Sequence, residues 1–150
     1  MNILVIDDCE YDAFELTSQL SAIFPDAAIT WVSSSEQALS EQLGQYDFCF
    51  IDQHMPEVLG TDLAESIRGH LNGSALRIIM LTGDGSDKTR ARALISDCDG
   101  FLTKPVDQSR LRAFLNGSRC RWEPSDLPRN IEHYWKLVDR RLASRNQLSN

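Results

Sequence analysis

Short runs of apolar residues recur along most of the chain, and each is too short to form a helix. They span four residues or fewer and are rich in β-branched and aromatic side chains, which is typical of buried strands. The runs are residues 3–6, 29–32, 48–51, 78–81 and 101–103. Because the apolar residues are continuous rather than alternating, each run predicts a strand that is covered on both faces.

Amphipathic helices are predicted between these strands, because apolar residues there recur at steps of three and four. Ser34 and Gln37 form a capping-box pattern for the second helix, which we expect to run through Leu43 and to end at Gly44. Asp107 is suited to the N-cap of the last helix. The other apolar stripes are Ala13, Leu16, Leu20 and Ile23; Leu63, Ile67 and Leu71; Ala91, Leu94 and Ile95; and Leu111, Phe114 and Leu115.

Alternating strands and helices predict an α/β fold, a doubly wound five-stranded parallel sheet with helices on both faces. In the strand order 2-1-3-4-5, the topological switch point lies between strands 1 and 3, and sites form at the carboxyl ends of the strands. We expect this domain to occupy residues 1–116, with a hinge and an amphipathic helical extension over residues 117–150.

Composition narrows the classes of function. The chain has 150 residues, 42% of them hydrophobic, and a formal net charge of -7, which fits one soluble globular domain. No run approaches the roughly 18 apolar residues of a membrane span, so we expect no membrane association. Residues 1–116 carry a net charge of -10 and residues 117–150 carry +3, so we expect no direct binding to nucleic acid.

The cysteines lie far apart and lack the spacing of metal ligands. They are Cys9, Cys49, Cys98 and Cys120. We expect reduced thiols that pack as small apolar side chains in a cytoplasmic protein.

Polar or charged residues stand at the carboxyl ends of four of the predicted strands. Asp7 and Asp8 come directly after the first strand, and Asp52 comes directly after the third. Thr82 ends the fourth strand, and Lys104 follows the fifth. Because the strands are parallel, all these residues are expected at one edge of the sheet, with the three aspartates side by side at the switch point.

Three gathered carboxylates need compensation, since two unit charges about 4 Å apart repel by roughly 4 kcal/mol at an effective dielectric near 20. Either one carboxyl group stays protonated, or a hard divalent cation occupies the site, and Mg²⁺ fits best because it leaves positions for phosphate oxygens. A lysine and a hydroxyl on the same edge supply a charge and a donor for those oxygens. The set favours phosphoryl transfer with Asp52 as nucleophile.

These motifs, together with Asp52-Gln53-His54-Met55-Pro56 and Gly60, resemble the receiver domain of two-component response regulators over about residues 1–116. The resemblance implies a fold of the chemotaxis-regulator type and phosphorylation of Asp52 by a histidine kinase or a phosphotransfer protein. It also implies Mg²⁺ held by Asp8, Asp52 and the backbone carbonyl of His54, with Asp7 acting through water.

The resemblance further implies that Thr82 and Lys104 hold the phosphoryl group and that Phe101 is the switch aromatic, although Phe101 also fits as plain core. It suggests a cis bond between Lys104 and Pro105. No nucleotide-binding residues are expected.

Several positions depart from the family pattern. Gly83 and Gly85 predict an unusually mobile loop after the fourth strand. Asp97-Cys98 stands where many members have Gly-Ala, so a left-handed helix cap at Asp97 is less well tolerated than at glycine.

The function that we expect is a phosphorylation-controlled switch of a protein-interaction surface, which catalyses only its own phosphorylation and slow dephosphorylation and is not a turnover enzyme. One alternative is the amino-terminal receiver of a longer regulator with an effector domain, for example a cyclic-dinucleotide enzyme. A remote alternative is a Mg²⁺-dependent phosphatase of the haloacid dehalogenase type. That class has Asp-x-Asp after the first strand, which Asp8-Cys9-Glu10 matches only approximately and which leaves Asp52 unexplained.

The extension carries an apolar stripe from Leu127 to Leu142 at helical spacing, after two prolines that break helical structure. Three roles stay open for it. It packs back on the receiver, it forms a homodimer or binds a downstream partner, or it begins a linker to an effector domain.

Overall fold

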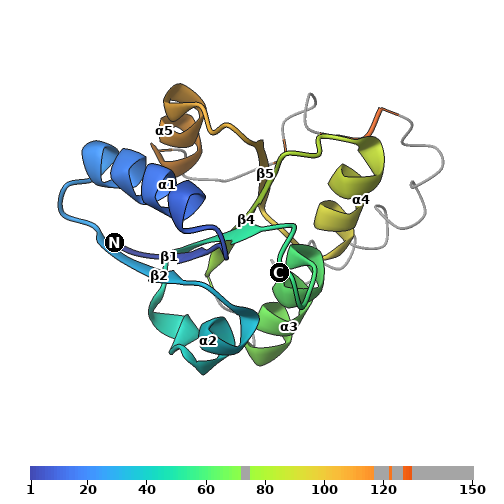
Figure 1. The fold of residues 1–150 in the computed structure, drawn as a ribbon, viewed down its shortest axis with the longest axis horizontal. Helices are drawn as coiled ribbons and strands as arrows, with labels where there is room; N and C mark the ends of the chain where they lie inside the picture. The colour runs from blue at the N-terminus through green and yellow to red at the C-terminus, as the bar shows by residue number, and fades with distance from the viewer. Residues whose placement is uncertain (72–74, 117–121, 123–126, 130–150) are drawn as a thin grey trace.

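The computed structural model describes residues 1–71, 75–116, 122 and 127–129. The strands of this part form one parallel sheet in the order β2-β1-β3-β4-β5, which confirms the predicted fold class (Figure 1). They are β1 (Asn2–Ile6), β2 (Ala28–Val32), β3 (Phe48–Asp52), β4 (Arg77–Thr82) and β5 (Gly100–Thr103). β1 pairs with both β2 and β3, so the chain crosses over beside β1 and the switch point lies between β1 and β3.

The helices cover both faces of the sheet, with α1 and α5 on one face and α2, α3 and α4 on the other (Figure 1). Their bounds are α1 (Glu10–Ile23), α2 (Ser35–Ser40), α3 (Gly60–His70), α4 (Asp87–Ile95) and α5 (Gln108–Asn116), with a 3-10 helix η1 (Leu43–Gln45) after α2. Within the described residues, none of these helices has the length and apolar character that crossing a bilayer requires.

Continuous apolar strands supply side chains to two separate cores. In β1, Ile3 and Val5 pack toward α1 and α5, whereas Leu4 and Ile6 pack toward α2 and α3. All four are fully buried. Each such side chain contributes about 1.5–3 kcal/mol on burial, so the sheet is anchored from both sides and its carboxyl edge is a rigid platform.

The prediction for the second helix was wrong at its end. Ser34 Oγ accepts a hydrogen bond from the Gln37 backbone N–H at 3.2 Å, as the capping pattern predicts. However, the helix stops at Ser40, whose hydroxyl donates to the Gln37 carbonyl at 2.8 Å and so competes with the helical backbone bonds. Leu43 and Gly44 lie in η1, and Leu43 still reaches the core.

The last helix begins as predicted. Asp107 Oδ1 accepts a hydrogen bond from the Ser109 backbone N–H at 2.7 Å, directly before the first turn of α5. This cap fixes where α5 leaves the loop that carries Lys104.

Candidate functional site

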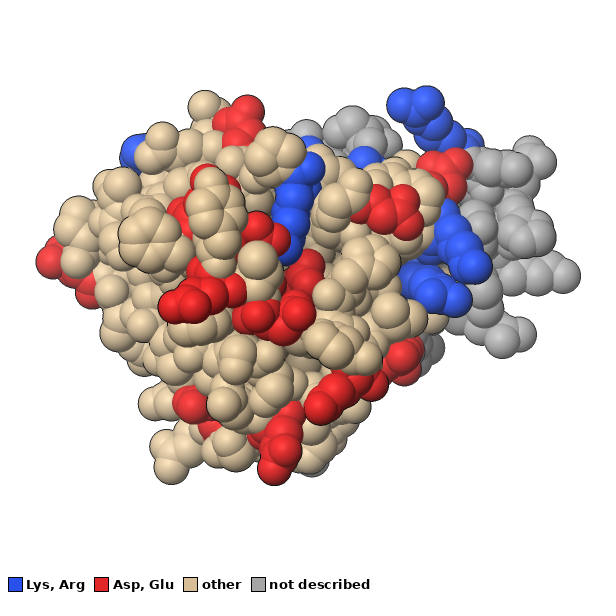
Figure 2. Space-filling model, viewed as in Figure 1, with Lys and Arg blue, Asp and Glu red and all other residues tan. Residues whose placement is uncertain are grey.

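The three predicted carboxylates meet at the ends of β1 and β3. Asp7, Asp8 and Asp52 each offer an oxygen, and these oxygens all lie within 4.8 Å of one another. Asp7 and Asp52 are buried, with 1% and 6% exposed, whereas Asp8 is exposed. Figure 2 shows acidic side chains gathered in the middle of the face viewed, with a basic side chain beside them. The sheet therefore brings the acidic cluster together at its switch point.

Lys104 is the counter-charge of this cluster. Its Nζ lies 2.9 Å from Asp7 Oδ2 and 3.0 Å from Asp52 Oδ1. It also lies 2.8 Å from Asp12 Oδ2, a residue in the first turn of α1 that the sequence reading missed. A signal was present, since Asp12 follows Asp8 by four residues and the predicted first helix faces the sheet near its carboxyl edge. Lys104 therefore bonds to three carboxylates at once.

The pKa values of Asp52 and Lys104 are both raised, for different reasons. Burial raises the pKa of Asp52, and the negative charges of Asp7 and Asp8 raise it further, while the hydrogen bond from Lys104 acts against them. Burial by itself lowers the pKa of Lys104, but hydrogen bonds to Asp12, Asp7 and Asp52 outweigh this effect and raise it. Lys104 is therefore a fixed cation, and Asp52 carries an unfavourable charge that a second cation would stabilise.

The donor set fits a hard divalent cation. Asp7, Asp8 and Asp52 supply only carboxylate oxygens, the ligands that Mg²⁺ prefers, and the exposure of Asp8 leaves an approach from solvent. Sulfur and imidazole ligands, which select softer metals, are absent from this set.

Thr82 lies at the end of β4 and is fully buried. Its Oγ1 accepts a hydrogen bond from the Asp84 backbone N–H at 2.9 Å. The Asp84 carboxylate in turn accepts from the Ser86 backbone N–H at 2.9 Å and from the Thr89 hydroxyl at 2.8 Å, and the backbone bond from Ser86 is the main reason that the pKa of Asp84 is lowered. The loop between Gly83 and Gly85 is thus joined to Thr82 at one end and to α4 at the other.

The loop after Asp52 is closed by its first residue. Gln53 accepts the Gly60 backbone N–H on its carbonyl and the Thr61 backbone N–H on Oε1, both at 2.9 Å. The intervening His54 has an exposed side chain and forms an isolated bridge with Leu59. This closure fixes the course of the backbone between Asp52 and Gly60, and the His54 imidazole takes no part in it.

Gly60 is required by close packing against the site. A Cβ atom at this position would lie 2.4 Å from the Asp52 carbonyl oxygen and 2.9 Å from Gln53 Cα. We expect Gly60→Ala to lower the free energy of unfolding by about 2 kcal/mol, because the backbone that it meets cannot move aside cheaply. Urea denaturation measures this loss. Gly69→Ala in the same helix is the control, since nothing lies within 4 Å of its Cβ and alanine there adds about 0.5–1 kcal/mol; equal effects of the two substitutions would contradict the packing argument.

The two remaining predicted residues are Phe101, which lies on β5, and Pro105, which follows Lys104. Phe101 is fully buried, and the guanidinium carbon of Arg90 lies 4.7 Å from its ring centroid. The Lys104–Pro105 peptide bond is cis. A further unpredicted contact comes from β2, where Trp31 Nε1 donates to the Asp7 carbonyl at 2.9 Å.

Two of the described cysteines fill the core. Cys49 and Cys98 are fully buried, and burial raises the pKa of the Cys49 thiol to about 12. Cys9 is exposed next to the acidic cluster, and Cys120 lies outside the described residues.

The predicted helix of the extension falls almost wholly on residues 130–150, which lie outside the described part of the chain. Trp122 and residues 127–129 are the described members of the extension.

Known proteins with similar sequences include two response regulators. The chain is 28% identical over 124 residues to response regulator RppA of Synechocystis, an alignment that covers 81% of this chain and 51% of RppA. It is 28% identical over 149 residues to the cyclic di-GMP phosphodiesterase response regulator RpfG of Xanthomonas campestris, which covers 99% of this chain and 39% of RpfG. The chain thus spans about half or less of the length of these relatives.

Among solved structures, the chain is similar to the complex of the Saccharomyces cerevisiae phosphotransfer protein Ypd1 with the receiver domain of Ssk1. The TM-score is 0.65 at 24% identity, with 74% of this chain and 83% of that chain covered, which shows a shared fold. The sequence model of the response regulator receiver domain matches residues 3–116, most of the chain. The chain therefore belongs to the response regulator receiver domain family.

Proposed function

We propose that Asp52 is the phosphoryl acceptor of a two-component signalling switch. The observation that carries this proposal is the placement of its carboxylate, buried at the end of β3, 3.0 Å from Lys104 Nζ and within the acidic cluster. A carboxylate in this position is a nucleophile flanked by one fixed cation and by ligands for a second. Family membership supports the proposal, because receiver domains are the phosphoacceptors of two-component systems.

Mg²⁺, which is typical of the family, would be held by Asp8, Asp52 and the His54 backbone carbonyl, with Asp7 acting through water. When bound it neutralises charge on the transferring phosphoryl group. Asp7 then serves mainly to hold Lys104 at the cluster, through the 2.9 Å contact between its Oδ2 and Lys104 Nζ.

The transfer forms one bond and breaks one bond. An Asp52 oxygen attacks the phosphorus of a phosphohistidine, a P–O bond forms, and the P–N bond breaks with its electron pair returning to the imidazole nitrogen. Lys104 and Thr82 would hold the phosphoryl oxygens, Lys104 as a charge and Thr82 as a hydroxyl donor. This chain carries out no further step than this acceptance and the later slow hydrolysis of its own aspartyl phosphate.

The phosphoryl donor would be a histidine kinase or a histidine phosphotransfer protein. The structural relative Ssk1 is a receiver in complex with such a phosphotransfer protein, Ypd1, which supports this class of partner. The product is a phosphorylated domain whose altered surface binds a downstream protein.

A second candidate is the receiver of a longer regulator that carries an effector domain. The observation in its favour is the alignment with RpfG, which covers 99% of this chain but only 39% of that relative. In this case phosphorylation of Asp52 would control an attached effector, of which a cyclic-dinucleotide enzyme is one type, instead of a separate partner protein.

Incubation with acetyl phosphate tests the proposed chemistry. We expect one phosphoryl group per chain in the presence of Mg²⁺, located on Asp52 by peptide mass spectrometry after borohydride trapping, and none in excess EDTA. A label on another residue would contradict Asp52 as the phosphoryl acceptor. Equal labelling in EDTA would contradict the role proposed for Mg²⁺.

A further inference from the structure

Residues beyond α5 lie on the surface formed by α4 and β5. Trp122 Nε1 donates a hydrogen bond to the Cys98 carbonyl at 2.9 Å, and its ring lies 5.8 Å from that of Phe101, tilted by 32°. Further along, the Arg129 backbone N–H donates to Asp87 Oδ1 at 2.9 Å, and Pro128 is buried. We call Trp122 together with residues 127–129 the docked segment.

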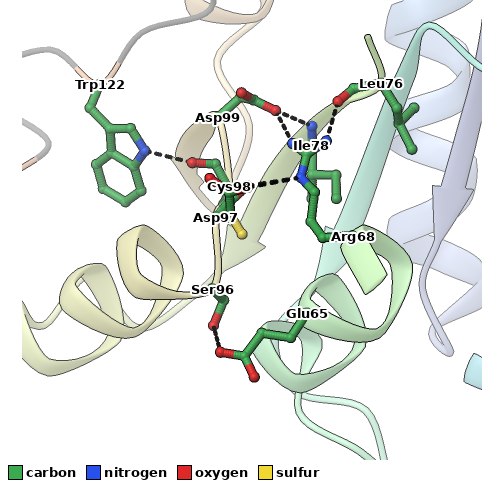
Figure 3. A network of polar contacts seen from close by, with 9 residues as sticks. All are labelled: Glu65, Arg68, Leu76, Ile78, Ser96, Asp97, Cys98, Asp99 and Trp122. Carbon is green, nitrogen blue, oxygen red and sulfur yellow. Dashed lines mark hydrogen bonds and ion pairs between the residues drawn. The ribbon is translucent and has the colours of Figure 1, made fainter. Parts of the chain in front are cut away.

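The carbonyl that receives Trp122 belongs to a braced loop between α4 and β5 (Figure 3). Arg68 of α3 donates to the carbonyls of Asp97 at 3.2 Å and Leu76 at 2.6 Å, and it pairs with the Asp99 carboxylate. Asp97 takes the left-handed conformation, with φ of 66°, at the position where we predicted a poorly tolerated cap. The loop is therefore held from the α3 side, and the indole binds to a carbonyl with a fixed direction.

Trp122 also packs at the end of a chain of contacts that starts at Thr82, the last residue of β4. Thr82 bonds to Asp84, next to Gly85, and the Gly85 carbonyl accepts from Arg90 Nε at 2.9 Å. The Arg90 guanidinium lies over the Phe101 ring, and the same ring contacts Trp122. Each member touches the next, so these contacts connect Thr82 to the ring against which Trp122 packs.

We propose that the docked segment is an internal latch on the α4–β5 surface, seated while Asp52 is unmodified and released when Asp52 is phosphorylated. This inference rests on the proposed function. The direction follows from Thr82, whose hydroxyl now accepts from Asp84 and would move toward a phosphoryl group on Asp52. That movement pulls the Asp84–Gly85 loop and Arg90 away from the Phe101 ring, and the stack that holds Trp122 is lost. Release exposes the α4–β5 surface to a partner only in the phosphorylated protein.

Fluorine NMR of the full chain labelled with 5-fluorotryptophan tests the latch. The resonance of each of Trp31, Trp122 and Trp135 is assigned by a single substitution to phenylalanine. Beryllofluoride with Mg²⁺ replaces the phosphoryl group, and its bound fluorines appear in the same spectrum. We expect the Trp122 resonance to move toward that of the free amino acid when beryllofluoride binds, and to stay unchanged in Asp52→Asn.

The outcomes separate the two proposals. Bound beryllofluoride with an unmoved Trp122 resonance overturns the latch and leaves the proposed function intact. Absence of bound beryllofluoride from the wild-type spectrum overturns both. A Trp122 resonance that already matches the free amino acid before addition overturns the latch as well, because the segment would not be docked.

Coupling between the two sites is reciprocal, so removal of the latch favours phosphoryl-site binding. We expect Trp122→Ala to bind beryllofluoride at least about 5-fold more tightly than wild type, the lower end of usual coupling strengths. Trp122→Phe keeps a ring against Phe101 and loses only the bond to the Cys98 carbonyl, so its affinity should fall between the two. Circular dichroism verifies that both variants are folded, and equal affinity of all three proteins contradicts the proposal.

Discussion

Asp52→Asn is expected to lose more than about 1,000-fold in the rate of phosphoryl incorporation, since it replaces the nucleophilic carboxylate with an uncharged amide. The same substitution should raise the free energy of unfolding in metal-free buffer by an amount on the order of 1 kcal/mol. Both effects have one origin. The Asp52 carboxylate is buried beside Asp7 and Asp8, where its charge is useful for chemistry and unfavourable for folding.

Lys104 does not remove this conflict, because it is shared among Asp7, Asp12 and Asp52. An asparagine at position 52 keeps an oxygen that accepts from Lys104 but adds no negative charge. Mg²⁺ therefore stabilises the wild-type protein more than the variant, and at a concentration 100 times the dissociation constant the wild-type gain is about 2.7 kcal/mol. The stability advantage of Asp52→Asn should shrink or reverse as Mg²⁺ is added.

The pH dependence of the stability has a defined sign. The pKa of Asp52 is raised in the folded protein, so its contribution to stability is fully present below the ordinary value of 3.8 and is lost as pH rises through the folded value. The advantage of Asp52→Asn should thus be largest near neutral pH and disappear in acid. Urea denaturation between pH 4 and pH 8 measures it, with Asp26→Asn at an exposed turn as the charge-matched control. A variant that is less stable than wild type throughout metal-free buffer would contradict this account.

The fold and the acidic cluster could be predicted from the sequence because both follow from short-range pattern and strand topology. A continuous apolar run such as residues 48–51 determines a buried strand, and the residue after it must then lie at the carboxyl edge of the sheet. The end of α2 was not predictable in this way, because the apolar pattern runs on to Leu43 and a local side-chain bond such as that of Ser40 to the Gln37 carbonyl has no signal in that pattern.

The missed residues depend on orientation rather than on pattern. Asp12 in the first turn of α1 pairs with Lys104 after β5, and the apolar stripe of α1, which indicates its buried face, does not identify this partner. Arg68 and Trp122 meet the same loop from opposite sides, and they are separated from it by at least one strand or helix along the chain. Periodicity identifies the buried face of a helix, whereas such long-range polar contacts require the packed structure.

Lys104→Met is expected to lower the free energy of unfolding by about 3 kcal/mol, because the substitution leaves buried carboxylates without their counter-charge. Lys104 Nζ lies within 3.0 Å of Asp7 and Asp52 oxygens, and these two side chains are only 2% and 8% exposed. Methionine has a similar length and preserves the packing of the methylene groups. The loss therefore measures charge compensation and not a cavity.

The sign of the pH effect distinguishes this explanation from simple loss of packing. In the wild type the pKa of Lys104 is raised, so the stability that it contributes is complete below 10.5 and is lost as pH rises through the folded value. In Lys104→Met the carboxylates repel each other without compensation, so the deficit should be greatest at neutral pH and should shrink as acid protonates them. A deficit that is constant from pH 4 to pH 8 would indicate packing instead.

A double substitution completes the test. If repulsion among carboxylates causes the loss, Asp52→Asn in the Lys104→Met background should restore more stability than Asp52→Asn adds to the wild type, since contacting charges are not additive. Lys88→Met on the exposed side of α4 is the matched control, expected to change stability by less than about 0.5 kcal/mol. Additive effects of the two substitutions would mean that Lys104 acts mainly on Asp7 and Asp12. Lys104 would then be available to the phosphoryl group without first releasing Asp52.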